Sequence, residues 1–215
     1  PVIRGQTAPR VSVLSDGAQL FDMSAISPDH ATTVEPMLSR KVEVLRGPST
    51  LLYGGGAIGG VVNVLDNKIP TRMPDGPVEG FVSARGNTVA DEQAGAVGLT
   101  ARAGDNIAIH VEGARRDADN YEVNGFTDQE INGTWAESNN ASVGLSWIGD
   151  RGYLGVAYSY RSDLYGLPGH SHEFEDCTSN GASLDCAEGG HDHAHGEEEA
   201  PYVDLDSRRV DLRGE

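Results

Sequence analysis

The sequence predicts a mainly β protein: about six strands of a transmembrane antiparallel β-barrel, preceded by a smaller mixed α/β domain. Three observations carry this prediction. Residues 78 to 160 contain stretches in which apolar side chains alternate with small or polar ones, the connections between them alternate in length, and glycine is abundant, with 28 residues in 215. Strands of about 10 alternating residues, joined by short turns at one end and long loops at the other, are typical of membrane-spanning barrels.

The first 70 residues contain short β-type runs that are interrupted by glycine and proline. These runs are RVSVLSDG (10–17), RKVEVLRGP (40–48) and GGVVNVLDN (59–67). The stretch IPTRMPDGP (69–77) holds three prolines and is interpreted as a linker. We therefore expect one domain at 1–70 and the first strands of a barrel at 71–215.

The barrel strands are predicted from alternation, which is clearest near residues 107, 141 and 154. In the middle stretch the side chains of Ala141, Val143, Leu145 and Trp147 share one face. Weaker versions lie at 78–86 and 94–104, and a further strand is expected near 203. A soluble β-sandwich would explain the alternation equally well. It would not explain an aliphatic face that ends in aromatic residues, which suits a membrane interface.

Composition excludes some classes of protein. The net charge of −17 argues against binding to nucleic acid, whose phosphates need a basic surface. No run of about 20 apolar residues is present, so no transmembrane helix is predicted. The chain begins at Pro1 rather than methionine, and we expect it to be part of a longer protein.

Residues 169–199 hold five of the seven histidines, both cysteines and nine acidic residues, without lysine or arginine. A His-x-His pair places two imidazoles on the same side of an extended backbone. Imidazole with carboxylate suits Zn²⁺ first, with Cu²⁺ and Ni²⁺ as competitors. The candidate metal ligands are His170, His172, Glu173, His191, His193 and His195. The alternative is a solvated acidic loop without a ligand. Cys177 and Cys186 are predicted to form a local disulfide, although both are also possible ligands.

A glycine-rich run, VEVLRGPSTLLYGGGAIGGVVNV (42–64), lacks the Gly-Lys-Ser/Thr ending of a phosphate-binding loop. It resembles the end of the plug domain of TonB-dependent outer-membrane receptors. Val42 to Leu45 match its strand, Arg46 to Pro48 its turn, Ser49 to Tyr53 its helix and Gly54 to Gly60 its glycine-rich turn. The opening PVIRGQTAPRVSVLSDG (1–17) resembles an earlier plug motif.

This resemblance implies a receptor in the outer membrane of a Gram-negative bacterium, surrounded by lipid and coupled to TonB, whose contact segment is absent here. Its barrel would have about 22 strands, so six are a part of it. The connection 165–202 would be extracellular. Glu43 and Arg46 would pair either with charges lining the barrel or within the plug.

The zinc-importing members of this family resemble the sequence in a further respect, because they carry an Asp-His pair on the plug beside a His-rich loop. Asp29 and His30 are therefore candidate metal ligands. His110 is expected to face the barrel lumen without a ligand role. We expect import of a transition metal, most of all zinc, with haem or metallophore uptake as the alternative. A zinc hydrolase is disfavoured because no helical His-Glu-x-x-His is present, and a purely adhesive barrel is disfavoured by the plug motifs.

Overall fold

The computed structural model describes residues 1–20, 22–25, 30–54, 56–123, 130–168, 177–179, 184–186 and 201–215. These residues form two main sheets and a separate short hairpin. No helix within the described residues has the length and apolar character needed to cross a membrane.

The N-terminal sheet contains four strands in the order β2-β1-β4-β3. They are β1 (Val11–Ser15), β2 (Ala18–Gln19), β3 (Lys41–Leu45) and β4 (Gly60–Leu65). β1 runs parallel to β4, and β3 runs antiparallel to it. A small core of Leu14, Ala57 and Val61 lies under this sheet. The two motifs at 1–17 and 42–64 therefore meet in one sheet.

The helices of this domain are short and of the 3₁₀ type: η1 (Met23–Ala25), η2 (Pro36–Leu38) and η3 (Gly47–Tyr53). The helix expected at Ser49 begins two residues earlier, with Pro48 in its first turn, where a missing N–H costs nothing. Gly54 ends it with a positive φ of 103°, a conformation that glycine adopts without penalty.

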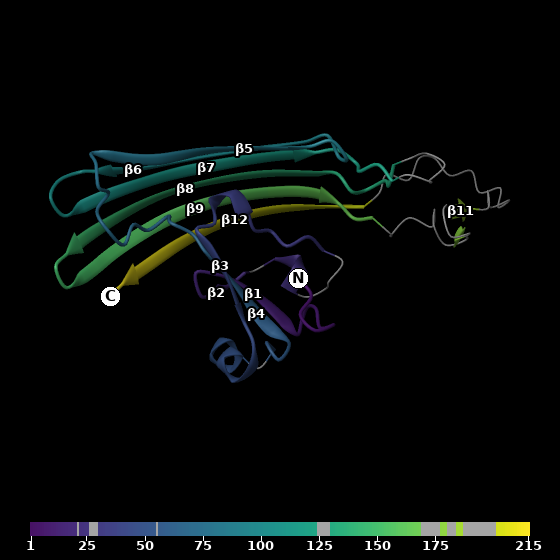
Figure 1. Ribbon diagram of the computed structural model, residues 1–215, viewed down its shortest axis with the longest axis horizontal. Helices are drawn as coiled ribbons and strands as arrows, with labels where there is room; N and C mark the ends of the chain where they lie inside the picture. The colour runs from purple at the N-terminus through teal and green to yellow at the C-terminus, as the bar shows by residue number, and fades with distance from the viewer. Residues whose placement is uncertain are drawn as a thin grey trace.

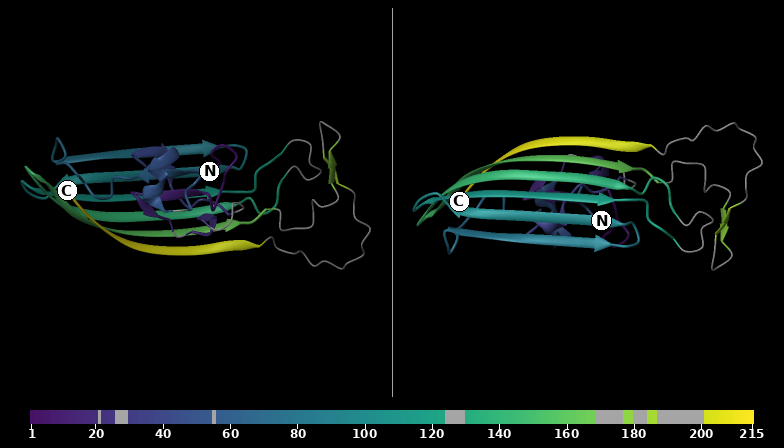
Figure 2. Two further views of the ribbon diagram at one scale, coloured as in Figure 1. Left: turned by 90° about the horizontal axis from the view of Figure 1, so that it is seen from below. Right: turned by 90° about the horizontal axis from the view of Figure 1, so that it is seen from above.

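The second sheet contains the six expected strands in the order β12-β9-β8-β7-β6-β5. Their bounds are β5 (Val78–Asn87), β6 (Glu92–Arg102), β7 (Ile107–Ala118), β8 (Ala136–Gly149), β9 (Gly152–Gly166) and β12 (Tyr202–Gly214). All neighbouring pairs are antiparallel, and the strands lie side by side in a curved, open sheet (Figures 1 and 2). The predicted antiparallel sheet is confirmed. The hairpin β10 (Cys177–Ser179) and β11 (Leu184–Cys186) was not expected from the sequence.

The two faces of the six-stranded sheet differ as the alternation predicts. Large apolar side chains lie on the convex face, where Ile109, Leu145 and Val156 are exposed. Trp147 is 57% exposed near the end of β8, which agrees with its expected place at a membrane interface. The opposite face carries small or polar side chains such as Ala108, Ala157 and Ser146, all buried.

The N-terminal domain lies against this second, concave face (Figure 1). The segment that leaves β4 crosses the sheet, and its Ile69 is only 3% exposed. Arg102 holds the predicted linker by donating hydrogen bonds from Nε and Nη2 to the carbonyl oxygen of Pro74, at 2.8 and 2.5 Å. The linker is therefore packed against the wall. The small side chains of the concave face provide the space it needs.

The connections of the sheet have a consistent polarity. The tight turns after β6 and β8 lie at one end, near residues 103–106 and 150–151. The connections after β5, β7 and β9 lie at the other end (Figure 1). Two of these, 119–135 and 167–201, are long, so the predicted separation of short turns from long connections holds.

Candidate functional site

Asp22 forms hydrogen bonds with residues on both sides of the predicted Asp29–His30 pair of the plug. One carboxylate oxygen of Asp22 accepts from Ser24 Oγ at 2.6 Å. The other accepts from the backbone N–H and the hydroxyl of Thr33, at 3.1 and 2.9 Å. Asp22 is 9% exposed, so these bonds are made away from solvent. A single buried carboxylate thus joins the two ends of the segment that contains His30.

This segment contacts the barrel wall at β9. Arg161 Nη1 donates to Thr33 Oγ1 at 3.1 Å, and the hydroxyl of Tyr165 lies 3.5 Å from Nδ1 of His30. Arg161 and Tyr165 both face inward because they are four residues apart on a strand. Tyr165 is the second-to-last residue of β9, just before the connection whose sequence contains the five other candidate histidines. The structure therefore places His30 beside the start of the His-rich connection.

The remaining candidate ligands lie outside the described residues: Asp29, His170, His172, Glu173, His191, His193 and His195. The backbone of the hairpin between the two histidine groups is described, and it pairs Cys177 directly with Cys186. In the part of the chain that the structure describes, no group of three or more His, Cys, Asp or Glu residues is arranged to hold a metal ion.

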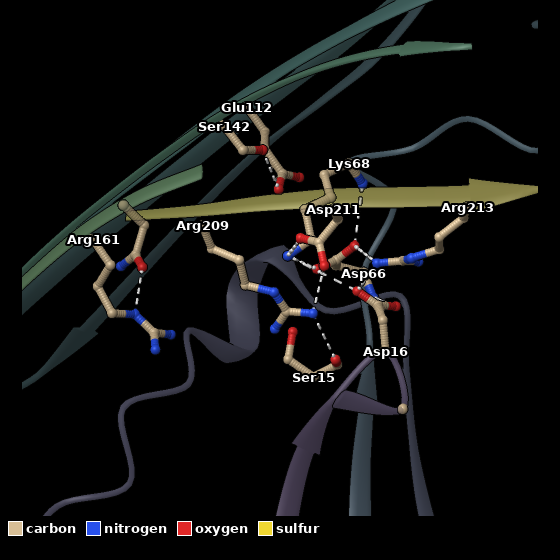
Figure 3. Close-up of polar contacts among 12 residues, drawn as sticks. Ser15, Asp16, Asp66, Lys68, Glu112, Ser142, Arg161, Arg209, Asp211 and Arg213 are labelled. Carbon is tan, nitrogen blue, oxygen red and sulfur yellow. Dashed lines mark hydrogen bonds and ion pairs between the residues drawn. The ribbon is translucent and has the colours of Figure 1, made fainter. Parts of the chain in front are cut away.

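A network of charged side chains joins the plug to β12 (Figure 3). Lys68 Nζ lies 2.8 Å from Asp66, 3.5 Å from Asp211 and 3.9 Å from Asp16. Arg213 forms an ion pair with Asp16, and Arg209 with Asp211. Lys68 is 6% exposed, so its charge is largely removed from water. Removing one partner from such a buried network lowers the stability of the folded protein by roughly 3 to 5 kcal/mol.

Two carboxyls of this network have shifted pKa values. Burial raises the pKa of Asp66 to about 7, the adjacent Asp16 adds to the rise, and Lys68 opposes it. Burial also acts to raise the pKa of Asp16, but its hydrogen bonds with Asp66 and Arg213 outweigh burial and leave that pKa below its ordinary value. The pair therefore shares a proton near neutral pH, with Asp16 the ionised partner.

Asp66→Asn is expected to flatten the dependence of plug stability on pH. The folded-state pKa of about 7 lies above the ordinary 3.8, so the stability that Asp66 contributes is complete below about pH 4 and is lost as the pH rises through 7. The slope is at most about 1.4 kcal/mol per pH unit. Protease cleavage of the plug, measured from pH 4 to 8, checks this expectation. Asp75→Asn, at a side chain 95% exposed, is the matched control; an equally steep profile for Asp66→Asn and the parent would contradict it.

Of the two charges left open by the sequence, Glu43 pairs within the plug. Its carboxylate lies 2.8 Å from Lys41 Nζ and accepts weakly from Asn63 at 3.5 Å. The hydrogen bond with Lys41 and the positive charge of that residue lower the pKa of Glu43. Of the two alternatives, Glu43 therefore forms the ion pair within the plug. Because this pair is exposed, it contributes little to the stability of the plug.

The sequence did not predict the roles of Asp22, Arg161 and the Asp16–Asp66–Lys68 network. A signal for the wall residues was present: charged side chains at alternating positions of β9 and β12 point to the lumen rather than to lipid. These are Arg161, Asp163, Arg209, Asp211 and Arg213. The plug residues carried no comparable signal, because short acidic turns are common at protein surfaces.

A small domain lodged against the concave, polar face of an antiparallel sheet with an apolar outer face defines a plug-and-barrel protein. Residues 1–61 match the family model described as the TonB-dependent receptor plug domain. This part of the chain is therefore similar in sequence to the plug domain of that family.

Solved structures give the same fold for the rest. A copper transporter, OprC, superposes with a TM-score of 0.62 at 17% identity, covering 79% of this chain and 25% of that one. The ferric enterobactin receptor PfeA of Pseudomonas aeruginosa gives 0.55 at 18%, covering 73% and 25%. The siderophore receptor PirA of Acinetobacter baumannii gives 0.56 at 19%, covering 76% and 25%. The chain thus spans about a quarter of the length of these proteins, which are named as a copper transporter, a ferric enterobactin receptor and a siderophore receptor.

Proposed function

We propose that this chain is the plug end and the first barrel strands of a TonB-dependent outer-membrane receptor that imports a transition metal, with zinc as its substrate. The observation that carries the proposal is the contact between His30 of the plug and Tyr165 at the end of β9. It brings the plug histidine to the strand end from which the connection with five histidines departs. His30 therefore lies at the end of the sheet where β9 ends, and β9 ends four residues before His170 in the sequence.

The proposed path has three steps. The connection 165–202, on the extracellular side, binds Zn²⁺ through His170, His172, His191, His193 and His195, with Glu173 as an oxygen ligand. Its surplus carboxylates raise the local cation concentration. Asp29 and His30 then accept the ion, on a segment that Asp22 and Arg161 hold against the wall. Force from TonB rearranges the plug and releases the ion inward.

Zinc titration of the full-length receptor by calorimetry tests the capture step. We expect several weak zinc equivalents, which disappear when residues 170–199 are deleted or when the five loop histidines are replaced by asparagine. Replacing Glu197, Glu198 and Glu199 by glutamine is the matched control, because it removes charge and keeps every imidazole. That variant should lose only salt-dependent affinity. Weak zinc binding that survives the histidine replacements would sink the capture step.

The plug step is tested by Asp29→Ala and His30→Ala. Each is expected to weaken the tightest zinc equivalent at least about tenfold, which is the smallest loss seen when a metal site loses a supporting group. Zinc-limited growth should slow in parallel. Unchanged tight binding together with unchanged growth would remove the plug site and leave the loop untouched.

Uptake of a metallophore or haem is the second candidate, because PfeA and PirA are named as enterobactin and siderophore receptors. The corresponding probes are a ferric siderophore and haem. A Soret shift on haem addition, or tight binding of the ferric siderophore with zinc binding absent, would favour this candidate over zinc.

We also propose that Cys177 and Cys186 form a disulfide. Residues directly opposite in an antiparallel pair have Cα atoms about 4.5 to 5.5 Å apart, within the range that a disulfide spans. The observed register, Cys177 opposite Cys186, supports the bridge. It would shorten the free part of the connection and leave its imidazoles available. Peptide mapping without reductant should recover the two cysteines as one linked species, and separate free peptides would contradict the bridge.

A further inference from the structure

A buried histidine–glutamate pair lies on the inner face of the wall, on β7. His110 is 2% exposed, and its Nε2 lies 3.1 Å from Oε2 of Glu112. Its other ring nitrogen, Nδ1, lies 2.7 Å from Thr100 Oγ1 on β6. The second oxygen of Glu112 accepts from Ser142 Oγ on β8 at 2.9 Å (Figure 3). Three neighbouring strands thus fix the orientation of the pair.

The charge of Glu112 is not balanced by a permanent cation. Its side chain is 4% exposed, and among the residues that the structure describes no lysine or arginine lies within ion-pair distance of it. In the cavity toward the plug, Lys68, Arg161 and Arg209 each pair with an aspartate. In the cavity beside the linker, Arg72 pairs with Glu79, and Arg40 is exposed and outside ion-pair distance of Glu112. A buried carboxylate needs a countercharge. Among the described residues, His110 is the group at ion-pair distance of Glu112.

Two cavities meet at Glu112. One of about 120 Å³ lies between the plug and β8, β9 and β12, and the other of about 340 Å³ lies beside the linker and β5. Glu35 and Arg161 line the first, whereas Thr100 and Glu79 line the second. A water molecule occupies roughly 30 Å³ in the liquid, so both spaces have room for a hydrated ion. Glu112 is therefore reachable from both along the boundary between plug and wall.

We propose that His110 Nε2 and Glu112 Oε2 form a transit site for a divalent metal ion on the barrel wall, below the His30 segment. The proposal rests on the proposed function, since it adds a step to the same import path. Two ligands at about 2.0 to 2.1 Å from a tetrahedral zinc lie roughly 3.3 Å apart, close to the 3.1 Å observed. The ion would replace the direct hydrogen bond, lying off the line between the two atoms at about 2 Å from each, with Nδ1–H donating to Thr100.

Two protein ligands, completed by water from the cavities, make a weak site. Weak binding is what a step along a permeation path requires, because an ion must leave as readily as it enters. The site also gives a role to the imidazole and the carboxylate on the inner face of β7, beside the small side chain of Ala108. Neutral side chains would satisfy Thr100 and Ser142 equally well without placing a charge there.

Crystals of the full-length receptor soaked in zinc chloride, with data collected at the zinc edge, test the site directly. An anomalous peak is expected about 2 Å from His110 Nε2. Glu112→Gln keeps the shape and the hydrogen bond from Ser142, and it should abolish this peak. Energised uptake of radioactive zinc should fall at least about tenfold in that variant, with zinc binding by the loop unchanged. Glu137→Gln, on the exposed face of β8, is the matched control.

The outcomes separate this site from the capture loop. A wild-type crystal without a peak at His110 overturns the wall site, whatever the loop binds. A peak that persists in Glu112→Gln also overturns it. A peak at His110 without zinc at the loop or at His30 supports the wall site, and in that case the proposed capture mechanism fails instead.

Discussion

Gly144→Ala is expected to lift the plug's exit segment off the barrel wall. Gly144 lies on the concave face of β8, and a methyl group built there overlaps the carbonyl oxygen of Lys68. The added methyl group is attached directly to the backbone of β8, and the oxygen belongs to the backbone of Lys68. Neither can therefore move aside as the end of a flexible side chain would. Overpacking of this kind costs about 1 to 3 kcal/mol, and more when the backbone is the obstacle. A loss of about 3 kcal/mol corresponds to roughly 100-fold more of the open form.

The measurement is the rate at which a protease cleaves the plug of the full-length receptor under conditions where opening is reversible, since cleavage then follows the open population. Gly113→Ala is the matched control, because a methyl group there meets only Asn140 O at 3.5 Å, an ordinary contact. If Gly144→Ala and Gly113→Ala are cleaved at the same rate, the packing of the segment at Lys68 against the wall does not require a glycine at position 144.

The same glycine illustrates what the sequence can and cannot predict. Alternation alone identified the strand around Val143 and Leu145 and assigned the small residues to the inner face. It did not identify Gly144 as the crossing point of the linker, because that depends on where residue 68 lies in space. Local periodicity is visible in a single sequence, but a contact between segments far apart is not.

The plug shows the same division. The motifs at 1–17 and 42–64 predicted the strands and the turn, and the structure joins them in one sheet. The ion network was not predicted, since it combines Asp16, Asp66 and Lys68 with a strand that begins at Tyr202. Each of these residues, taken alone, is typical of a surface turn. Only the fold makes them buried partners.

For the proposed metal site, the sequence shows which candidate ligand residues are present, and the structure shows the position of one of them, His30. His30 is a candidate ligand by resemblance; its contact with Tyr165 gives its position at the end of β9, and its role as a ligand stays a prediction. His110 was expected to be an inward-facing residue without a ligand role, and its burial agrees with the inward direction. The pairing with Glu112 was implicit in the alternation, because residues two apart on a strand share a face.

Lys68→Met is expected to give the largest loss of plug stability of any single substitution in the ion network. The change removes the ammonium that lies within 4 Å of three aspartates and keeps most of the side-chain volume. Removing one partner of a buried ion pair costs roughly 3 to 5 kcal/mol, because the remaining charge stays buried.

The double variant with Asp66→Asn should recover at least about 1 kcal/mol of this loss, since it removes the stranded carboxyl as well. Plug proteolysis across the four members of this cycle, at pH 8 where the Asp66 carboxyl is mostly ionised, measures both quantities. Lys41→Met, at an exposed pair, serves as the control and should change little. Additive effects of the two substitutions would contradict the coupling, and a loss no greater than that of Lys41→Met would show that the network does not hold the plug.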